Sequence, residues 1–434
     1  MSSAPPSSVL RSPRLWLGTG IIVAVVSTLF ALLYVGGNVN PKGNLRDLPV
    51  ALVNSDKGVD ANGKHVNFGD QVVSGIKKSA ASNDSFDWQV LSREEADKRL
   101  GQGKLFGALV VPKDFTAAVT GLTVPQQKEA LRPTLTVLTN QSAGSIGSSM
   151  ASQANQKVAH TASAQLGKEL LKRAGGQGAQ LAPAAQLMLA DPVTVEVADG
   201  HPLGGHSAMG LSAFYYALVL LVCGMLGANV INSQVDTALG YFHSDFGPFR
   251  MRMPVRHTSR VRTLAIGAVL MLASSVVMGS LVEAVTVGIL DMDASHLGLL
   301  WLYSVATIAV VGVSALALLA VFGTPGMLLS AIVFIAMAVP SSGATVPLEA
   351  LPGFFRALAE FEPLRQITGG LRSILYYGAQ ADAGLTRAWA SMGIALVAAV
   401  LFGFGVTRFY DRKGMHRIAR PTEETDAAQV PAAV

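Results

Sequence analysis

The chain has 434 residues, of which 50% are hydrophobic and only 14% are charged, and its formal net charge is +5. With a mean hydropathy of +0.42, this composition excludes a disordered chain and an ordinary soluble domain. The excess of Lys and Arg does not indicate nucleic-acid binding, because many of these bases flank apolar runs, where they orient a membrane protein. The single cysteine, Cys223, leaves no disulfide within the chain.

Six apolar runs without paired charges predict six transmembrane helices. Four to five of them reach the roughly 20 residues that cross about 30 Å of hydrocarbon. The runs lie at 15–37, 208–231, 264–288, 299–322, 326–340 and 388–409. The first could instead be a cleaved signal peptide, but its length and the lack of an Ala-x-Ala site at Gly36-Gly37-Asn38 favour an uncleaved anchor.

The distribution of Lys and Arg predicts the orientation of the chain. Residues 1–14 contain two Arg and no acid, loop 232–263 contains five Arg against two Asp, and the tail 410–434, expected to be disordered, begins with several bases. The positive-inside rule then places both termini and loop 232–263 in the cytoplasm of a multi-pass protein of the cell membrane, most simply a bacterial plasma membrane.

Residues 38–207, between the first and second predicted helices, indicate an extracytoplasmic α/β domain. Short apolar strands are predicted at 49–53, 88–91, 105–111, 134–138 and 193–197. Helices are predicted at 66–78, at 92–100, where Ser92 and Glu95 form a capping box, and at 143–173, an Ala/Ser/Gln-rich segment with a weak apolar face. Strands that alternate with helices predict a small sheet covered by helices.

Three segments carry a resemblance to a known family. They read LPVALVNSDKGV, DWQVLSREEADKRLGQGKLFGALVVPKDFT and, before the last run, AMAVPSSGATVPLEALPGFFRALAEFEPLRQITGGLRSILYYG. In this order they resemble type-2 ABC exporter permeases, most closely the phage-infection-protein (YhgE/Pip) branch. The resemblance implies a permease that works as a homodimer or paired with another permease, energised by a separate cytoplasmic ATPase. It also implies an outer re-entrant segment at 343–387, within a five-helix region spanning 208–409. Some relatives in this branch resemble surface receptors or secretion-system components.

Motifs for chemistry are absent from the sequence. No Gly-x-x-x-x-Gly-Lys-Ser/Thr is present, so the chain has no P-loop of its own, and we expect no enzymatic activity and no cofactor. His201 and His206 are the nearest approach to a metal motif, but only Asp199 lies close by in sequence and no thiol does, so we expect no metal site.

Two groups of residues are candidates for function. Asn229, Asn232 and Glu283 are polar residues in or beside predicted spans; the asparagines either join helices or mark an interface edge. Glu283 either faces the bundle interior or reaches the outer interface. The second group lies in the cytoplasmic loop, where aromatic residues alternate with arginines: Phe246, Phe249, Arg250, Arg252 and Arg256.

Two roles for that loop remain open. In the permeases that this chain resembles, a short cytoplasmic surface helix docks into the ATPase. An amphipathic basic segment could instead lie on anionic headgroups, with about 1 kcal/mol per base.

Two functions from different classes follow. The first is an exporter of an amphiphilic or hydrophobic substrate, because nearly uncharged spans argue against an ion-selective aqueous path. The alternative is a receptor or secretion-apparatus component without transport activity. A bare anchor needs one helix rather than six, which favours transport.

Overall fold

The computed structural model describes residues 13–415, apart from 62–63, 81–83, 123–131, 177–185, 187–188, 243, 247–248 and 252. Most of both predicted cytoplasmic tails, 1–12 and 416–434, therefore lies outside the described residues. The chain divides into two compact units. One comprises the residues up to Phe214 together with 292–295 and 336–386, and the other comprises 215–291, 296–335 and 387–434.

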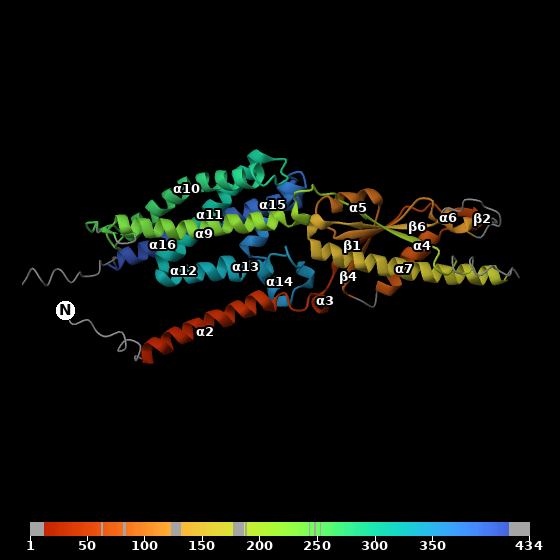
Figure 1. Cartoon of the computed structure of the whole chain (residues 1–434), viewed down its shortest axis with the longest axis horizontal. Coiled ribbons are helices and arrows are strands. Elements are labelled where there is room, and N and C mark those ends of the chain that lie inside the picture. Colours follow the sequence, from red (N-terminus) through yellow and green to blue (C-terminus); the bar gives the residue numbers. More distant parts are fainter. Residues whose placement is uncertain are drawn as a thin grey trace, which may run out of the picture. The chain divides into compact units, whose positions relative to one another are not determined.

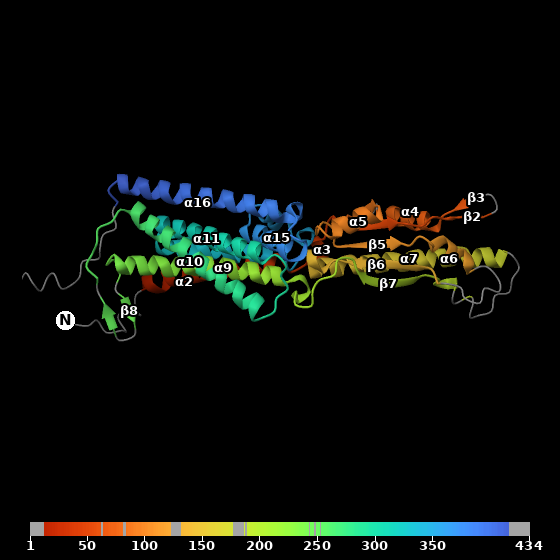
Figure 2. The ribbon, with the colours of Figure 1, turned by 90° about the horizontal axis from the view of Figure 1, so that it is seen from above.

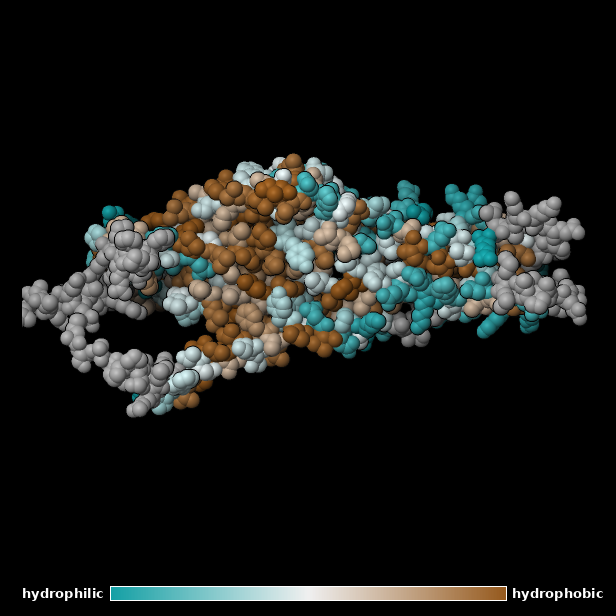
Figure 3. All heavy atoms as spheres, viewed as in Figure 1, coloured by the Kyte–Doolittle hydropathy of each residue, from teal (hydrophilic) through white to brown (hydrophobic). Residues whose placement is uncertain are grey.

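Among the described residues, six helices are long and apolar enough to cross a membrane, as the sequence predicted (Figure 1). They are α2 (Pro13–Gly36), α9 (Ser212–Ala238), α10 (Arg260–Gly288), α11 (Leu297–Phe322), the interrupted helix α12 (Thr324–Ala331) with α13 (Ala338–Ser341), and α16 (Thr386–Arg412). Hydrophobic side chains cover the visible surface of these helices, whereas hydrophilic ones are frequent over the α/β domain (Figure 3). The chain is therefore a multi-pass membrane protein.

The α/β domain contains a five-stranded mixed sheet with the strand order β4-β1-β5-β6-β7. Its strands are β1 (Leu48–Asn54), β4 (Phe86–Leu91), β5 (Gly107–Val111), β6 (Thr134–Thr139) and β7 (Thr194–Asp199). β1 pairs in parallel with β4 and β5, β5 pairs antiparallel with β6, and β6 pairs in parallel with β7. Central strands β1 and β5 are apolar along nearly their whole length because helices cover both of their faces.

All five predicted strands are present, and the predicted helices are α4 (Phe68–Ala80), α5 (Arg93–Leu100) and α7 (Ser145–Gly176). The Ser92 side chain accepts a hydrogen bond from the Glu95 backbone N–H (3.2 Å), as the capping motif predicted. The sequence did not predict the short helices α3 (Pro41–Asn44) and α6 (Phe115–Gly121) or the hairpin of β2 (Val59–Ala61) with β3 (Lys64–Val66).

Helix α7 packs on its own sheet through a face of small residues (Figures 1 and 2). Ala151, Asn155 and Ala159 are fully buried there, at the three- and four-residue spacing of one helix face. A Cβ added at Gly107 would lie 2.7 Å from the Leu138 carbonyl oxygen and 3.4 Å from Ala151. Small side chains thus allow a helix with little apolar character to approach the sheet closely.

The segment expected as an outer re-entrant element belongs to the same compact unit as the α/β domain. It contains α14 (Gly353–Ala359), α15 (Pro363–Tyr376) and a π-helical turn (Ala381–Leu385). Leu351 and Phe355 share a hydrophobic cluster with Leu48 and Val50 of the sheet and with Leu33 of α2. Helix α2, the sheet and this segment therefore bury one common core.

Candidate functional site

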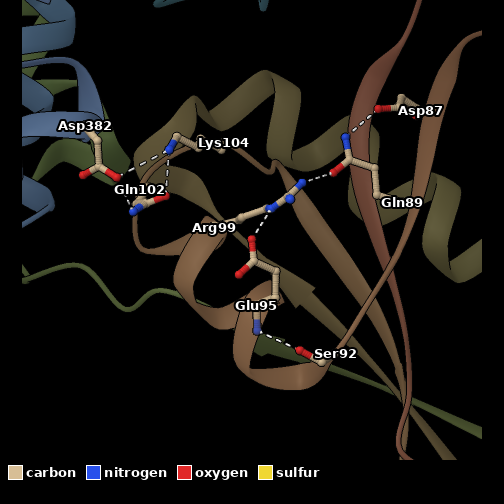
Figure 4. Close-up of polar contacts among 8 residues, drawn as sticks. All are labelled: Asp87, Gln89, Ser92, Glu95, Arg99, Gln102, Lys104 and Asp382. Carbon is tan, nitrogen blue, oxygen red and sulfur yellow. Dashed lines mark hydrogen bonds and ion pairs between the residues drawn. The ribbon is translucent and has the colours of Figure 1, made fainter.

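Polar side chains connect the α/β domain to the π-helical turn that precedes α16 through a hydrogen bond and an ion pair (Figure 4). The Gln102 Nε2–H donates to Asp382 Oδ2 (2.8 Å), and Lys104 Nζ lies 3.7 Å from the same carboxylate. Lys104 also donates to Gln102 Oε1 (2.9 Å). Gln102 and Lys104 lie in the turn between α5 and β5, so a contact between residues 280 positions apart holds this turn against the segment 381–385.

The remaining side chains in Figure 4 fix α5 against the edge strand β4. Arg99 Nε lies 2.7 Å from Glu95 Oε1, and Arg99 Nη1 donates to Gln89 Oε1 (2.7 Å). The adjacent Arg99 guanidinium lowers the pKa of the Glu95 carboxyl. Because both side chains are still partly exposed to solvent, this network orients α5 more than it stabilises it.

A buried asparagine organises the turn between β6 and α7. The Asn140 Nδ2 group donates to the carbonyl oxygens of Leu100 (2.9 Å) and Leu105 (2.8 Å). Its backbone N–H donates to Ser148 Oγ (2.9 Å). Since a buried polar group is costly unless it is paired, these bonds specify one arrangement of the three segments.

Helix α15 places one cation and several aromatic residues beside this turn. The Arg372 Nε and Nη2 groups are buried and have no hydrogen-bond partner among the described residues. Burial lowers the pKa of Arg372 and raises the pKa of Tyr377 to about 12. The neighbouring Tyr376 hydroxyl accepts from the Ala213 backbone N–H (3.0 Å) at the start of α9.

Glu362 begins α15 from a buried position. It is 3% exposed, and its Oε2 accepts the Arg365 backbone N–H (2.9 Å), which caps the helix. Its Oε1 has no hydrogen-bond partner among the described residues. Burial raises the pKa of Glu362 to about 7, against the opposing effect of these backbone donors. The carboxyl therefore titrates near neutral pH.

The intramembrane polar candidates do not converge on one site. Asn229 Nδ2 donates to the Met225 carbonyl oxygen (2.8 Å) and Asn232 Nδ2 to Asp236 Oδ2 (3.4 Å), both within α9. Asn232 also lines a cavity of about 30 Å³, enough for about one water molecule. Glu283 lies in α10 five residues before its end, and its Oε2 is buried without a hydrogen-bond partner in the described part of the chain.

Loop 232–263, which the sequence analysis predicted to be cytoplasmic, contains a β-hairpin where the resemblance implied a short surface helix. β8 (Ser244–Phe246) pairs antiparallel with β9 (Phe249–Met251), with Asp245 opposite Arg250 and Phe246 opposite Phe249. From Phe249 to Met253, apolar residues alternate with arginines at a period of two, which suits a strand better than a helix and explains the difference. The side chains of Phe246, Phe249 and Arg250 and all of Arg252 lie outside the described residues. Arg256 is exposed, and its N–H donates to Leu239 O (3.0 Å).

Beside this loop, a carboxylate that the sequence reading did not single out caps α10. Asp411 of α16 accepts the backbone N–H groups of Arg260 (2.9 Å) and Val261 (3.1 Å). A negative charge at a helix N-terminus pairs with free N–H groups and the helix dipole. The only sequence signal was an acid at the end of a span, and its partner is about 150 residues away.

The two histidines considered as metal ligands have separate structural roles. The His201 Nε2–H donates to the Tyr376 carbonyl oxygen (2.8 Å), and the His206 backbone N–H donates to Asp293 Oδ2 (2.7 Å). Within the described ranges, no group of three or more His, Cys, Asp or Glu side chains is placed to hold a metal ion.

In the described part of the chain, six apolar helices and an α/β domain between the first two define a polytopic membrane protein with a large α/β region. The family model described as "Protein of unknown function (DUF3533)" matches residues 19–395, and the chain belongs to this family. A stretch of 158 residues, 35% of the chain, is 25% identical to "Uncharacterized protein YhgE" of Bacillus subtilis (strain 168). The match spans 20% of that relative's length. The chain is thus a membrane protein similar to YhgE.

Proposed function

We propose that this chain is the permease subunit of an ABC-type exporter, which moves an amphiphilic or hydrophobic substrate outward at the expense of ATP hydrolysed by a separate ATPase. The observation that carries the proposal is a π-helical segment within the fifth span. There, α12 continues into a π-helical turn (Ile332–Ala336) before α13, which contains Pro340. Single π-helical turns inside α-helices are rare and are frequently found at functional sites. A passive anchor has no need of one.

The positions of the irregular turns support the same proposal. The chain passes between the two compact units at five points, and two of these lie at the π-helical turns: 335–336, inside the first turn, and 386–387, directly after the second. In the second turn Ala383 and Gly384 leave the helical conformation, with Gly384 at φ +107°. Such turns absorb backbone rotation at a few residues, as hinges between moving bodies do.

Partner capture tests the proposal. The full-length protein, cross-linked in its native membrane and purified, should recover an ABC ATPase. Charge reversal of Arg250, Arg252 and Arg256 should weaken that capture if the loop hairpin forms the docking surface. Charge reversal of Arg412, Lys413 and Arg417 in the C-terminal tail is the matched control. Recovery of no ATPase, together with capture of a surface ligand by the α/β domain, would favour the receptor alternative.

The proposal requires both termini and loop 232–263 in the cytoplasm. A reporter fused after Lys413 should be cytoplasmic, and one inserted at Asn83 should be on the opposite side. An Asn83 reporter found in the cytoplasm would overturn the orientation and with it the outward direction of transport.

A further inference from the structure

The α/β domain has a cavity of about 470 Å³ between α4, α7 and the edge strand β4. This volume falls within the range of about 300–1,000 Å³ that is typical of small-molecule sites. The residues of α7 that line it extend from Met150 to Gln165. At about 1.5 Å per residue this run is about 22 Å long, so the cavity is an elongated groove. We call it the α4–α7 groove.

Apolar side chains form the floor of the groove. Phe86 and Trp88 extend from the same face of β4, with ring centroids 5.9 Å apart, and Val72 and Ile76 of α4 are buried beside them. Two half-buried aromatic rings at the edge of a sheet leave apolar surface accessible to a ligand. Such a floor suits a hydrocarbon chain better than a sugar or a nucleotide.

The charged residues that line the groove are all positive. Lys42 and Lys157 line it, and its described lining residues include no acid. Neither lysine is within ion-pair distance of a described carboxylate, whereas the opposite face of the sheet has the Arg99–Glu95 pair. The exposed ammonium groups are therefore available to a negatively charged partner.

One end of the groove adjoins the membrane. Lys42 lies in α3 (Pro41–Asn44), which begins five residues after the first span ends at Gly36. Leu45, also in the lining, shares the hydrophobic cluster that includes Leu33 of α2. The groove length of about 22 Å exceeds the roughly 15 Å depth of one leaflet, half of the hydrocarbon core, so a whole acyl chain fits along it.

We propose that the α4–α7 groove binds a membrane lipid with one acyl chain and an anionic head group, taken from the leaflet that adjoins the domain. The acyl chain lies along Phe86 and Trp88, and Lys42 and Lys157 pair with the head group. This inference deepens the proposed transport function by naming the chemistry of the amphiphile. Its binding assay needs no ATPase, so the two proposals can fail separately.

Quenching of Trp88 fluorescence by a brominated fatty acid tests the proposal. Replacing Trp16, Trp301 and Trp389 by Phe leaves Trp88, inside the groove, as the one tryptophan of the full-length protein. The protein is placed in nanodiscs of zwitterionic lipid. Added 9,10-dibromostearate should quench Trp88 saturably. A brominated monoacylglycerol of the same chain length, which has no charge, should bind roughly tenfold more weakly, because it lacks the attraction of two lysines.

Two variants separate groove binding from quenching by the nearby bilayer. Gly75→Leu places a side chain in the groove, where the nearest atom to a new Cβ is Gln165 Oε1 at 3.8 Å, and it should abolish saturable quenching. This substitution also favours the α4 helix, so the fold should persist. Lys42→Glu with Lys157→Glu should weaken binding of the fatty acid, while Lys98→Glu with Lys113→Glu, outside the groove, should not.

Quenching that persists in Gly75→Leu would arise from the bilayer and would overturn the site. Equal binding of the charged and uncharged probes would overturn the anionic head group. Absence of saturable quenching by either probe would overturn the lipid ligand and leave a partner protein as the occupant to seek.

Discussion

Replacing Glu362 by Gln should remove a pH-dependent loss of stability. Glu362 is buried at the start of α15, and burial raises the pKa of its carboxyl from 4.5 to about 7. Between these two pH values the folded protein binds a proton that the unfolded chain has released. The stability that the Glu362 carboxyl contributes to the folded state is therefore fully present below pH 4.5 and is lost as the pH rises through about 7.

The magnitude follows from the two pKa values. A pKa difference of about 2.5 corresponds to roughly 3 kcal/mol at 1.36 kcal/mol for each pKa unit. Glutamine remains neutral at every pH, and its side-chain oxygen can still accept the Arg365 N–H. We therefore expect the unfolding free energy of Glu362→Gln to lie within about 1 kcal/mol of the wild-type value near pH 5 and to exceed it by up to about 3 kcal/mol at pH 8.

Thermal unfolding of the full-length protein in nanodiscs between pH 5 and 8 measures this effect. The melting temperature of the variant minus that of the wild type should increase with pH by several degrees. Glu349, whose pKa burial also raises, is present in both proteins and cancels in the difference. Glu360→Gln is the control, because that side chain is 57% exposed. A temperature difference that stays constant with pH would refute a raised pKa at Glu362.

Three further substitutions test the packing. Leu109 is 1% exposed in the sheet, and Leu109→Ala should lower the unfolding free energy by about 3 kcal/mol, measured by urea unfolding followed by hydrogen exchange. Val197 on β7 is 54% exposed, and Val197→Ala should lower it by less than about 1 kcal/mol. Equal losses in the two variants would contradict the assigned core. Asp411→Ala should speed hydrogen exchange at the first turn of α10 by an amount that corresponds to about 1 kcal/mol or more, and unchanged exchange there would rule out the cap. Arg372→Met should raise the melting temperature, because it removes a buried unpaired charge; a lower temperature would show that a bound anion pairs with the guanidinium.

Local periodicity in the sequence was sufficient to locate the spans and strands. Apolar runs of about 20 residues can satisfy their backbone only as helices in a membrane, so their positions follow from composition alone. The cap at Ser92 and Glu95 is equally local, since both partners lie within one helical turn. The loop hairpin was missed because the resemblance to permeases was followed in preference to the alternation of apolar residues and arginines from Phe249 to Met253.

Only the tertiary structure decided which segments share a core and where polar groups meet. Asp411 accepts a hydrogen bond from the start of α10, about 150 residues away in the sequence, and Asp382 accepts one from Gln102, 280 residues away. The α4–α7 groove combines residues of α3, α4, β4 and α7. None of these residues has a distinctive neighbourhood in the sequence, because long-range contacts are set by how the elements pack. The sequence by itself therefore determined the class of protein and most of its elements, while the packing of those elements determined the α4–α7 groove and the long-range polar contacts.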